Sequence, residues 1–208
     1  MQIAILLFDR LTALDAVGPY EVLSRLPGAT VTFVAQDLGV KRTTNGSLAL
    51  TADAGLADVP APEIVLVPGG IGRKELMDDG PVHEWLRTAH ETSTWTTSVC
   101  TGSLILAAAG LLEGKRATTH WLAMEELGSL GAEPVSERVV FDGKIVTSAG
   151  VSSGIDMALA LAARIAGEQV AQAIQLSIEY DPQPPFDSGS PRTASPQTVE
   201  LIRARAAR

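Results

Sequence analysis

Short apolar runs that alternate with stretches of helical spacing are the feature that most limits how this chain can fold. Such runs occupy residues 2–8, 30–35 and 64–67, and a β-prone run follows at 95–99. The first of them, at 2–8, is a continuous apolar run, as expected of a parallel strand that is buried on both faces. Parallel strands of one sheet are joined by crossover connections that are usually helices. The sequence therefore predicts an α/β fold, in which a mostly parallel central sheet carries helices on both faces.

Turn residues and helical spacing mark where the remaining elements begin and end. The dipeptide Asp142-Gly143 lies between short apolar runs at 138–141 and 144–148, which predicts a hairpin. Further short strands are expected at 48–51 and 117–119. The spacing of apolar residues predicts helices at 12–26, 81–91, 104–109, 121–130, 153–166 and 168–178.

Length and composition indicate a single domain over residues 1–208 with a core of its own. The chain has 208 residues, of which 46% are hydrophobic, and no repeat divides it. Residues 180–196 are rich in Pro, Gly and Ser, so an irregular tail is expected there. A C-terminal helix is expected at 197–208.

Charge and cysteine content narrow the expected surroundings of the protein. The formal net charge of −8 opposes binding to nucleic acid. A single cysteine excludes an intrachain disulfide and a multi-cysteine metal site, and it favours a reducing compartment. The first residues do not resemble a secretory leader, and the longest uncharged stretch, 92–112, is too rich in hydroxyls for a membrane span. We therefore expect a cytoplasmic protein with neither nucleic acid nor membrane as a partner.

Cys100, the only cysteine, directly follows the β-prone run 95–99 and precedes the small residues Thr101, Gly102 and Ser103. A strand, a sharp turn and a helix in this order place the sulfur at a helix N-terminus, where backbone N–H groups favour a thiolate. The spacing Ser-x-Cys-x-Gly also matches the logic of a nucleophile elbow. The alternative is a buried cysteine that acts as a small hydrophobe.

Asp15 is a carboxylate in an otherwise apolar segment just after the first expected strand. The cost of burying an unpaired acid favours an exposed position at the start of the helix. The alternative is a buried acid near Cys100. Burial and a neighbouring thiolate would both raise its pKa, so that Asp15 could hold a proton and act as a general acid.

Glycines follow two of the expected strands. Gly69 and Gly70 would allow close backbone approach and, with the N–H of Thr101, could stabilise a developing negative charge; the alternative is a plain tight turn. Gly150 and Val151 precede the helix at 153–166 and are candidates for the same anion-stabilising or substrate-binding role. Carboxyl ends of parallel strands meet at one edge of a sheet, so these loops are expected to converge with Cys100.

The histidines and two aromatic residues give weaker signals. His120 could act as a base toward Cys100 or form structural hydrogen bonds, whereas His83 and His90 are expected to face solvent. Trp121 and Phe186 are candidate pocket walls, or else core or interface aromatics. The spacing of His and carboxylate residues gives no metal site.

Several stretches together make the chain resemble the ThiJ/PfpI superfamily, relatives of the class I glutamine amidotransferases, and within it the isocyanide (isonitrile) hydratases. The resemblance runs over nearly the whole length. It is carried by Leu14-Asp15-Ala16-Val17-Gly18-Pro19, Pro68-Gly69-Gly70, Thr97-Ser98-Val99-Cys100-Thr101-Gly102-Ser103, Ala117-Thr118-Thr119-His120-Trp121, Gly154-Ile155-Asp156 and Pro184-Pro185-Phe186-Asp187-Ser188-Gly189-Ser190-Pro191.

The resemblance implies a homodimeric, flavodoxin-like α/β sandwich that hydrates isocyanides to N-substituted formamides. Cys100 would be the nucleophile, Asp15 the general acid and base, and Thr101 the residue that holds the carboxylate in place. Water and an isocyanide would be the only reactants, with no cofactor and no metal. Amidase-like and protease-like members carry a histidine directly after the cysteine, so Thr101 counts against a peptidase or glutaminase.

Two other functions stay open at this point. Cys100 could be the sensor of a redox or stress protein without turnover, or it could serve a glyoxalase-like or hydrolase-like enzyme that acts on small carbonyl compounds. The same core also occurs in regulators with an AraC-type DNA-binding region. The acidic balance and the lack of a helix-turn-helix pair after the core make that function unexpected here.

Overall fold

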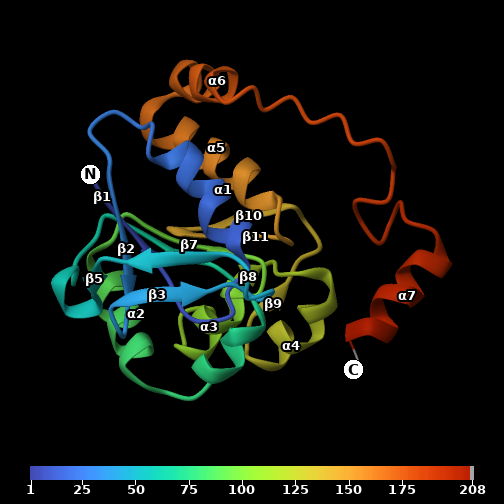
Figure 1. The fold of residues 1–208 in the computed structure, drawn as a ribbon, viewed down its shortest axis with the longest axis horizontal. Helices are drawn as coiled ribbons and strands as arrows, with labels where there is room; N and C mark the ends of the chain where they lie inside the picture. The colour runs from blue at the N-terminus through green and yellow to red at the C-terminus, as the bar shows by residue number, and fades with distance from the viewer. Residues whose placement is uncertain (207–208) are drawn as a thin grey trace. The chain divides into compact units, whose positions relative to one another are not determined.

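The computed structural model describes residues 1–206, which fall into two compact units, Met1–Ile178 and the segment that starts at Glu179. The first unit holds the central sheet and the helices around it (Figure 1). Its main elements are, in order, β1 (Gln2–Leu6), α1 (Ala13–Leu23), β2 (Thr30–Ala35), β3 (Gly39–Arg42), β4 (Ala49–Ala52), β5 (Ala54–Gly55), β6 (Ile64–Val67), α2 (Pro81–Thr92), β7 (Trp95–Val99), α3 (Gly102–Ala108), β8 (Arg116–Ala117), α4 (Met124–Ser129), β9 (Glu133–Pro134), β10 (Val139–Asp142), β11 (Ile145–Ser148), α5 (Ser153–Ala166) and α6 (Glu168–Ser177). Short 3-10 helices span Leu56–Asp58, Ile71–Leu76 and Trp121–Ala123.

The central sheet has seven strands in the order β10-β11-β7-β6-β1-β2-β5. All neighbours are parallel except β10 and β11, which form the antiparallel hairpin predicted around Asp142-Gly143. The inner order β2-β1-β6-β7-β11 is that of a doubly wound, flavodoxin-like sheet. The chain leaves β1 toward β2 on one side, and β6 lies on the other side. The carboxyl ends of β1 and β6 therefore flank the switch point at which such sheets bind ligands.

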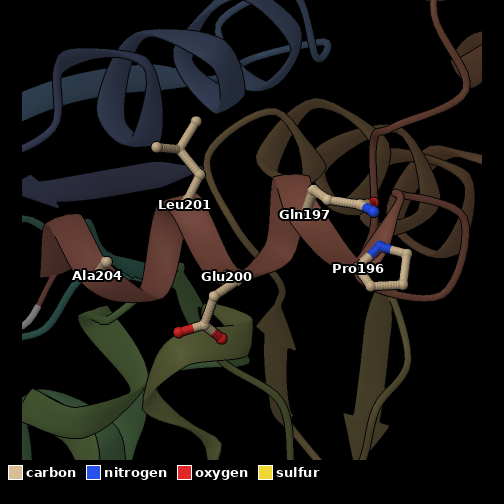
Figure 2. Close-up of a pocket in the computed structure, with 5 residues that line it drawn as sticks. All are labelled: Pro196, Gln197, Glu200, Leu201 and Ala204. Atoms are coloured by element: carbon tan, nitrogen blue, oxygen red, sulfur yellow. The ribbon is translucent and has the colours of Figure 1, made fainter.

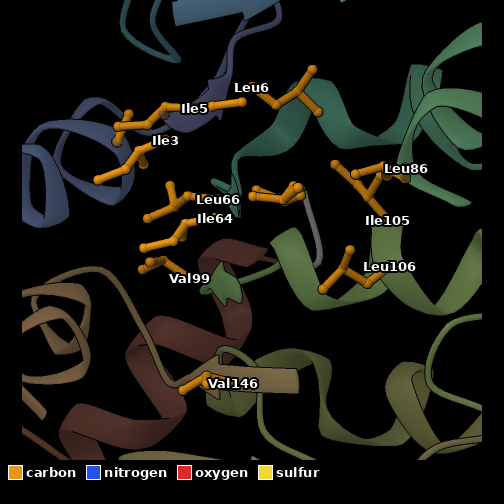
Figure 3. Packing of buried hydrophobic residues seen from close by; sticks show 14 of the residues in the cluster. Ile3, Ile5, Leu6, Ile64, Leu66, Leu86, Val99, Ile105, Leu106 and Val146 are labelled. Atoms are coloured by element: carbon orange, nitrogen blue, oxygen red, sulfur yellow. The ribbon is translucent and has the colours of Figure 1, made fainter. Parts of the chain in front are cut away.

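Helices cover both faces of this sheet, as the sequence predicts. Helices α1, α5 and α6 lie over one face, and α2, α3 and α4 lie over the other (Figure 1). Strands β1 and β6 form the middle of the core, and their burial on both faces explains why they are continuous apolar runs. A fully buried Ile or Leu contributes roughly 1.5–3 kcal/mol. Figure 3 shows part of this core, including Ile3, Ile5, Ile64, Leu66, Val99 and Leu106.

Both edges of the sheet are short or accompanied by other backbone. Strand β5 has only two residues. Beside β10 lies the segment that contains β8. There the Arg116 N–H donates to Asp142 Oδ2 at 3.0 Å, and the Thr118 N–H donates to Thr147 Oγ1 of β11 at 2.8 Å.

The expected elements agree with the structure in the core and differ mainly in the short peripheral strands. Strands β2, β6 and β7 and helix α5 have the expected bounds. The strand expected at 117–119 is Arg116–Ala117, and the helix expected at 121–130 is divided between Trp121–Ala123 and α4. Strand β3 was not expected, because it pairs antiparallel with β4 outside the main sheet and only Lys41 of its residues is buried.

The second unit is described by itself. It is irregular up to helix α7 (Pro196–Ala206), which has no buried residue. The irregular segment agrees with the expected tail, and residues 207 and 208 of the expected helix lie outside the described residues. A single domain over 1–208 stays a prediction. Figure 2 shows a shallow surface pocket lined by α7 residues, none of which is a candidate site residue: Pro196, Gln197, Glu200, Leu201 and Ala204.

Within residues 1–206, no helix combines the length and the apolar character needed to cross a membrane.

Candidate functional site

Most candidate site residues lie in four segments that follow strands at the carboxyl edge of the sheet. These segments follow strands that are neighbours in the order β1, β6, β7 and β11. Their candidate residues are Asp15 after β1, Gly69 and Gly70 after β6, Cys100 and Thr101 after β7, and Gly150 and Val151 after β11.

Cys100 occupies a strained turn between β7 and α3. Its φ of 56° lies in the left-handed region, which costs a residue with a side chain about 1–2 kcal/mol. The end of β11 helps to hold this turn, since the Cys100 N–H donates to the carbonyls of Ser148 at 3.1 Å and Ala149 at 3.0 Å. Gly102 lets the turn pack closely, because a Cβ there would lie 2.1 Å from the Val67 carbonyl oxygen. The side chain of Cys100 is consequently presented at the carboxyl edge, although the residue is 5% exposed.

Asp15 lies in the first turn of α1 and is completely buried. Its Oδ2 accepts a hydrogen bond of 2.9 Å from the Gly69 N–H, whereas Oδ1 is buried without a conventional hydrogen-bond partner among the described residues. Burial raises the pKa of Asp15 to about 7, although hydrogen bonding from Gly69 and from the Cys100 thiol opposes the rise. The expectation of an exposed Asp15 is wrong. The buried alternative holds, because Gly69 and the thiol partly replace lost water.

Burial also raises the pKa of the Cys100 thiol to about 12, and the charge of nearby Asp15 adds to the effect. Hydrogen bonds from the backbone N–H groups of Val151 and Thr101 and from the Thr101 side chain act in the opposite direction. The expectation that the helix N-terminus favours a thiolate is therefore outweighed by burial; helix α3 has only seven residues. The thiol is therefore protonated near neutral pH, where the Asp15 carboxyl gains and loses its own proton.

The Gly69–Gly70 loop packs closely against the turn at Cys100. A Cβ on Gly69 would lie 2.5 Å from Thr101 N and 3.0 Å from Asp15 Oδ2, so a side chain does not fit. The Gly70 N–H donates to Thr101 Oγ1 at 3.1 Å. Both glycine N–H groups are thus engaged, by Asp15 and by Thr101. Their contacts favour a positioning role, and Thr101 connects to the carboxylate through this loop and not by a direct hydrogen bond within residues 1–206.

Val151 is the second strained residue of the site. Its φ of 28° is unusual for a β-branched residue. In this conformation its N–H donates to the Cys100 sulfur and lowers the pKa of the thiol. The preceding Gly150 lies against His120, and a Cβ there would be 2.8 Å from His120 Cδ2. The two N–H groups directed at sulfur are therefore those of Val151 and Thr101.

His120 caps the short helix that begins at Trp121. Its Nδ1 accepts from the Leu122 N–H at 3.3 Å, which places the proton of the neutral ring on Nε2. Burial lowers the pKa of His120, so the neutral form is favoured. The ring lies 6.0 Å from that of half-buried Trp121, and no hydrogen bond joins it to Cys100 within residues 1–206. These contacts favour the structural alternative over that of a base.

One expectation about histidine exposure is wrong, one is partly wrong, and one alternative for Phe186 is excluded. His83 is 1% exposed, because the buried face of α2 is wider than the apolar spacing indicates. His90 is half-buried, and its Nδ1 lies 2.7 Å from Thr96 Oγ1. Phe186 is 78% exposed, so of its expected places the core is excluded. Among residues 1–206 no cluster of three or more His, Cys, Asp or Glu side chains could hold a metal ion.

Fold and site together define a doubly wound α/β protein with a strained cysteine beside a buried carboxyl group at the carboxyl edge of its sheet. The model of the DJ-1/PfpI family matches residues 1–164. The chain belongs to the DJ-1/PfpI family, which confirms the resemblance found in the sequence.

Three comparisons place the chain within the family. It is 47% identical over 207 residues to the isonitrile hydratase of Pseudomonas putida, covering 100% of this chain and 90% of that protein. The crystal structure of a ThiJ/PfpI family protein from Pseudomonas syringae has 36% identity and a TM-score of 0.95, over 99% of this chain and 86% of that one. The transcriptional regulator CdhR of Pseudomonas aeruginosa is 29% identical over 83% of this chain, which spans only 52% of that regulator.

Proposed function

We propose that this protein catalyses the hydration of isocyanides to N-substituted formamides, with Cys100 as the nucleophile and Asp15 as the acid and base. The observation that carries the proposal is the pair itself, a buried carboxyl with a pKa of about 7 beside the only cysteine of the chain. Groups that accept and return a proton near neutral pH are suited to acid–base catalysis. The isonitrile hydratase of Pseudomonas putida supports the choice of substrate.

In the first half of the reaction, the Asp15 carboxylate removes the thiol proton as the sulfur attacks the terminal carbon of R–N≡C. The lone pair of sulfur forms the S–C bond. The proton then passes from Asp15 to the same carbon, which gives the thioimidate R–N=CH–S–Cys100. The strained turn at Cys100 acts as a nucleophile elbow. The N–H groups of Thr101 and Val151 stabilise the sulfur while it carries negative charge.

In the second half, Asp15 is a carboxylate again and removes a proton from water, which attacks the thioimidate carbon. The nitrogen takes up the proton, so the adduct is R–NH–CH(OH)–S–Cys100. Loss of the hydroxyl proton and cleavage of the C–S bond release R–NH–CHO, and the thiol is protonated again. One water is consumed for each isocyanide, and the proposed reaction uses no cofactor and no metal.

We further propose that the protein acts in the cytoplasm as a homodimer and binds no nucleic acid. Dimerisation is supported by the family resemblance, and exposed Phe186 is a candidate interface residue. The net charge of −8 opposes contact with nucleic acid. A sedimentation measurement that gives twice the mass of one chain, without a shift on adding DNA, is the expected result.

Formamide production from a simple aryl isocyanide tests the proposed activity. Wild type should form the formamide, and Cys100→Ala should lose at least about a thousandfold in rate because no covalent intermediate can form. The comparison requires that Cys100→Ala has the same circular dichroism spectrum as wild type. Absence of product from wild type, or equal turnover by both proteins, would contradict the proposal.

A further inference from the structure

Two hydroxyl groups from different parts of the chain hold the carbonyl oxygen of Cys100. Ser103 Oγ donates to it at 3.2 Å from the first turn of α3. Thr119 Oγ1 donates at 3.0 Å from a segment that lies 19 residues further along the chain. Thr119 is 1% exposed, so water does not compete for this hydrogen bond. Thr119 thus ties the turn at Cys100 to a separate part of the fold.

The residue that follows Thr119 contacts the other strained part of the site. His120 lies against Gly150, where a Cβ would be 2.8 Å from His120 Cδ2. Val151 comes directly after Gly150, and its N–H bonds the Cys100 sulfur. The segment 119–120 therefore contacts the backbone on both sides of the hydrogen bond between Val151 and sulfur.

Strained backbone needs such contacts, because a left-handed conformation of a residue with a side chain persists only when its surroundings impose it. Both Cys100 and Val151 are of this kind, with φ values of 56° and 28°. Without the Thr119 hydroxyl, the Cys100 carbonyl keeps only Ser103 as a side-chain donor among residues 1–206. Ser103 belongs to the same turn and would move with it. Thr119 is the side-chain donor that fixes the turn relative to the rest of the first unit.

We propose that Thr119 is a positioning residue, whose hydroxyl holds the Cys100 peptide in the conformation that directs the sulfur to the N–H groups of Thr101 and Val151. This inference rests on the proposed function in one respect, that Cys100 is the reacting group. Thr119 itself does not touch the reacting atoms. Its loss should lower the rate of reactions at sulfur far more than it lowers stability.

The test compares Thr119→Val with the matched control Thr97→Val. Thr97 is also completely buried, and its Oγ1 donates to a backbone carbonyl, that of Val65, at 2.9 Å. Each substitution removes one buried hydroxyl of nearly the same hydrogen-bond length, but only one of the two bonds holds the nucleophile. Thermal unfolding, formamide production and the pH dependence of alkylation by iodoacetamide are measured for both variants. Cys100 is the only cysteine, so alkylation reports on this site alone.

Both variants should lose similar thermal stability, but only Thr119→Val should slow alkylation and formamide production, by about tenfold to a hundredfold. The midpoint of its alkylation profile should shift to higher pH, because the misplaced sulfur loses hydrogen bonds that lower the pKa of the thiol. Thr119→Ser keeps the hydroxyl and should restore both readouts. Thr119→Ala replaces Thr119→Val if the latter does not fold.

Equal alkylation and turnover by Thr119→Val and Thr97→Val would overturn the inference, as would a Thr119→Ser variant as slow as Thr119→Val. Alkylation needs no isocyanide, so a failure of the proposed reaction leaves this test intact. Conversely, formamide production by wild type together with unchanged alkylation in Thr119→Val would refute the role of Thr119 alone.

Discussion

Strand β7 has only five residues, but the backbone and the polar groups at its two ends are arranged in opposite ways. At the amino end, Thr96 has regular strand geometry, and its hydroxyl bonds His90 Nδ1 at 2.7 Å and Ser93 Oγ at 3.1 Å. At the carboxyl end, Cys100 has a φ of 56°, and the buried Oδ1 of Asp15 has no conventional hydrogen-bond partner within the described residues. One end is satisfied and regular; the other is strained and incompletely paired.

The difference shows where this fold can place a reactive group. Polar groups with complete hydrogen bonding have nothing left to offer a substrate, and their role is stability. Strain and unpaired polar atoms persist only where surrounding structure imposes them, and they concentrate at functional sites. The carboxyl edge is held in this state by glycines at close approach and by hydrogen bonds from β11.

Asp15→Asn changes the incompletely paired carboxyl group at the carboxyl end and should have the largest effect on turnover. The amide can still accept from the Gly69 N–H, but it cannot take up a proton, so turnover should fall about 10²–10⁴-fold. Initial rates of formamide production measure the loss. A variant within threefold of wild type would remove Asp15 from the proposed reaction.

The same variant should be more stable than wild type at about pH 8. The folded pKa of Asp15 is raised from 3.8 to about 7, so the folded state binds more protons than the unfolded state between these values. Stability of wild type therefore falls as pH rises from about 4 to 7, by up to about 4 kcal/mol for a shift of roughly three units. Urea unfolding at about pH 4 and 8 should show a gain for Asp15→Asn only at the higher pH; equal gains would contradict the linkage.

The pH dependence of turnover should follow the same carboxyl group. Asp15 must be charged to remove the thiol proton, so kcat/KM should be constant well above pH 7. Below about pH 7 it should fall about tenfold for each pH unit. A profile that is flat between about pH 5 and 8, measured while the protein stays folded, would contradict this role.

Gly69→Ala and Gly143→Ala compare two glycines with different roles. Gly69 is needed for close packing at the site, and Gly143 is needed for the backbone conformation of a turn away from it. A Cβ on Gly69 would collide with Thr101 N and approach Asp15, which should cost about 1–3 kcal/mol and most of the activity. Gly143, in the β10–β11 turn near the amino end of β7, has a φ of 60° and open space around it. Gly143→Ala should cost only about 1–2 kcal/mol and leave turnover unchanged. Chemical denaturation and formamide assays of both variants test the contrast; equal activity losses would remove it.

Thr96→Val removes a hydroxyl at the amino end of β7, where the polar groups are hydrogen-bonded, and should have the smallest effect on turnover. The variant leaves His90 Nδ1 and Ser93 Oγ without this partner, which should cost about 1–2 kcal/mol. The turnover rate should match that of wild type, because the change lies at the opposite end of the strand. A tenfold loss of turnover would show that the two ends are coupled.

Sequence patterns identified the core strands and the loops that follow them because both depend on local features. Strands β2, β6 and β7 are rich in β-branched residues and are followed by turn or small residues, and Cys100 is unique. The exposure of Asp15 and His83 could not be read from the sequence in the same way. The burial of Asp15 depends on Gly69, which is 54 residues away in the chain. The burial of His83 depends on how α2 packs against the rest of the first unit. The strain at Val151 has no sequence signal, since valine rarely adopts a positive φ.

The two edges of the central sheet bear on aggregation. An exposed edge strand offers N–H and C=O groups on which a second chain can add a strand of its own. Strand β5, with two residues, is too short to act as a template, and the segment around Arg116 and Thr118 runs beside the hairpin at the other edge. The protein can therefore keep a wide sheet, with a strained reactive end, while offering little edge for intermolecular strand pairing.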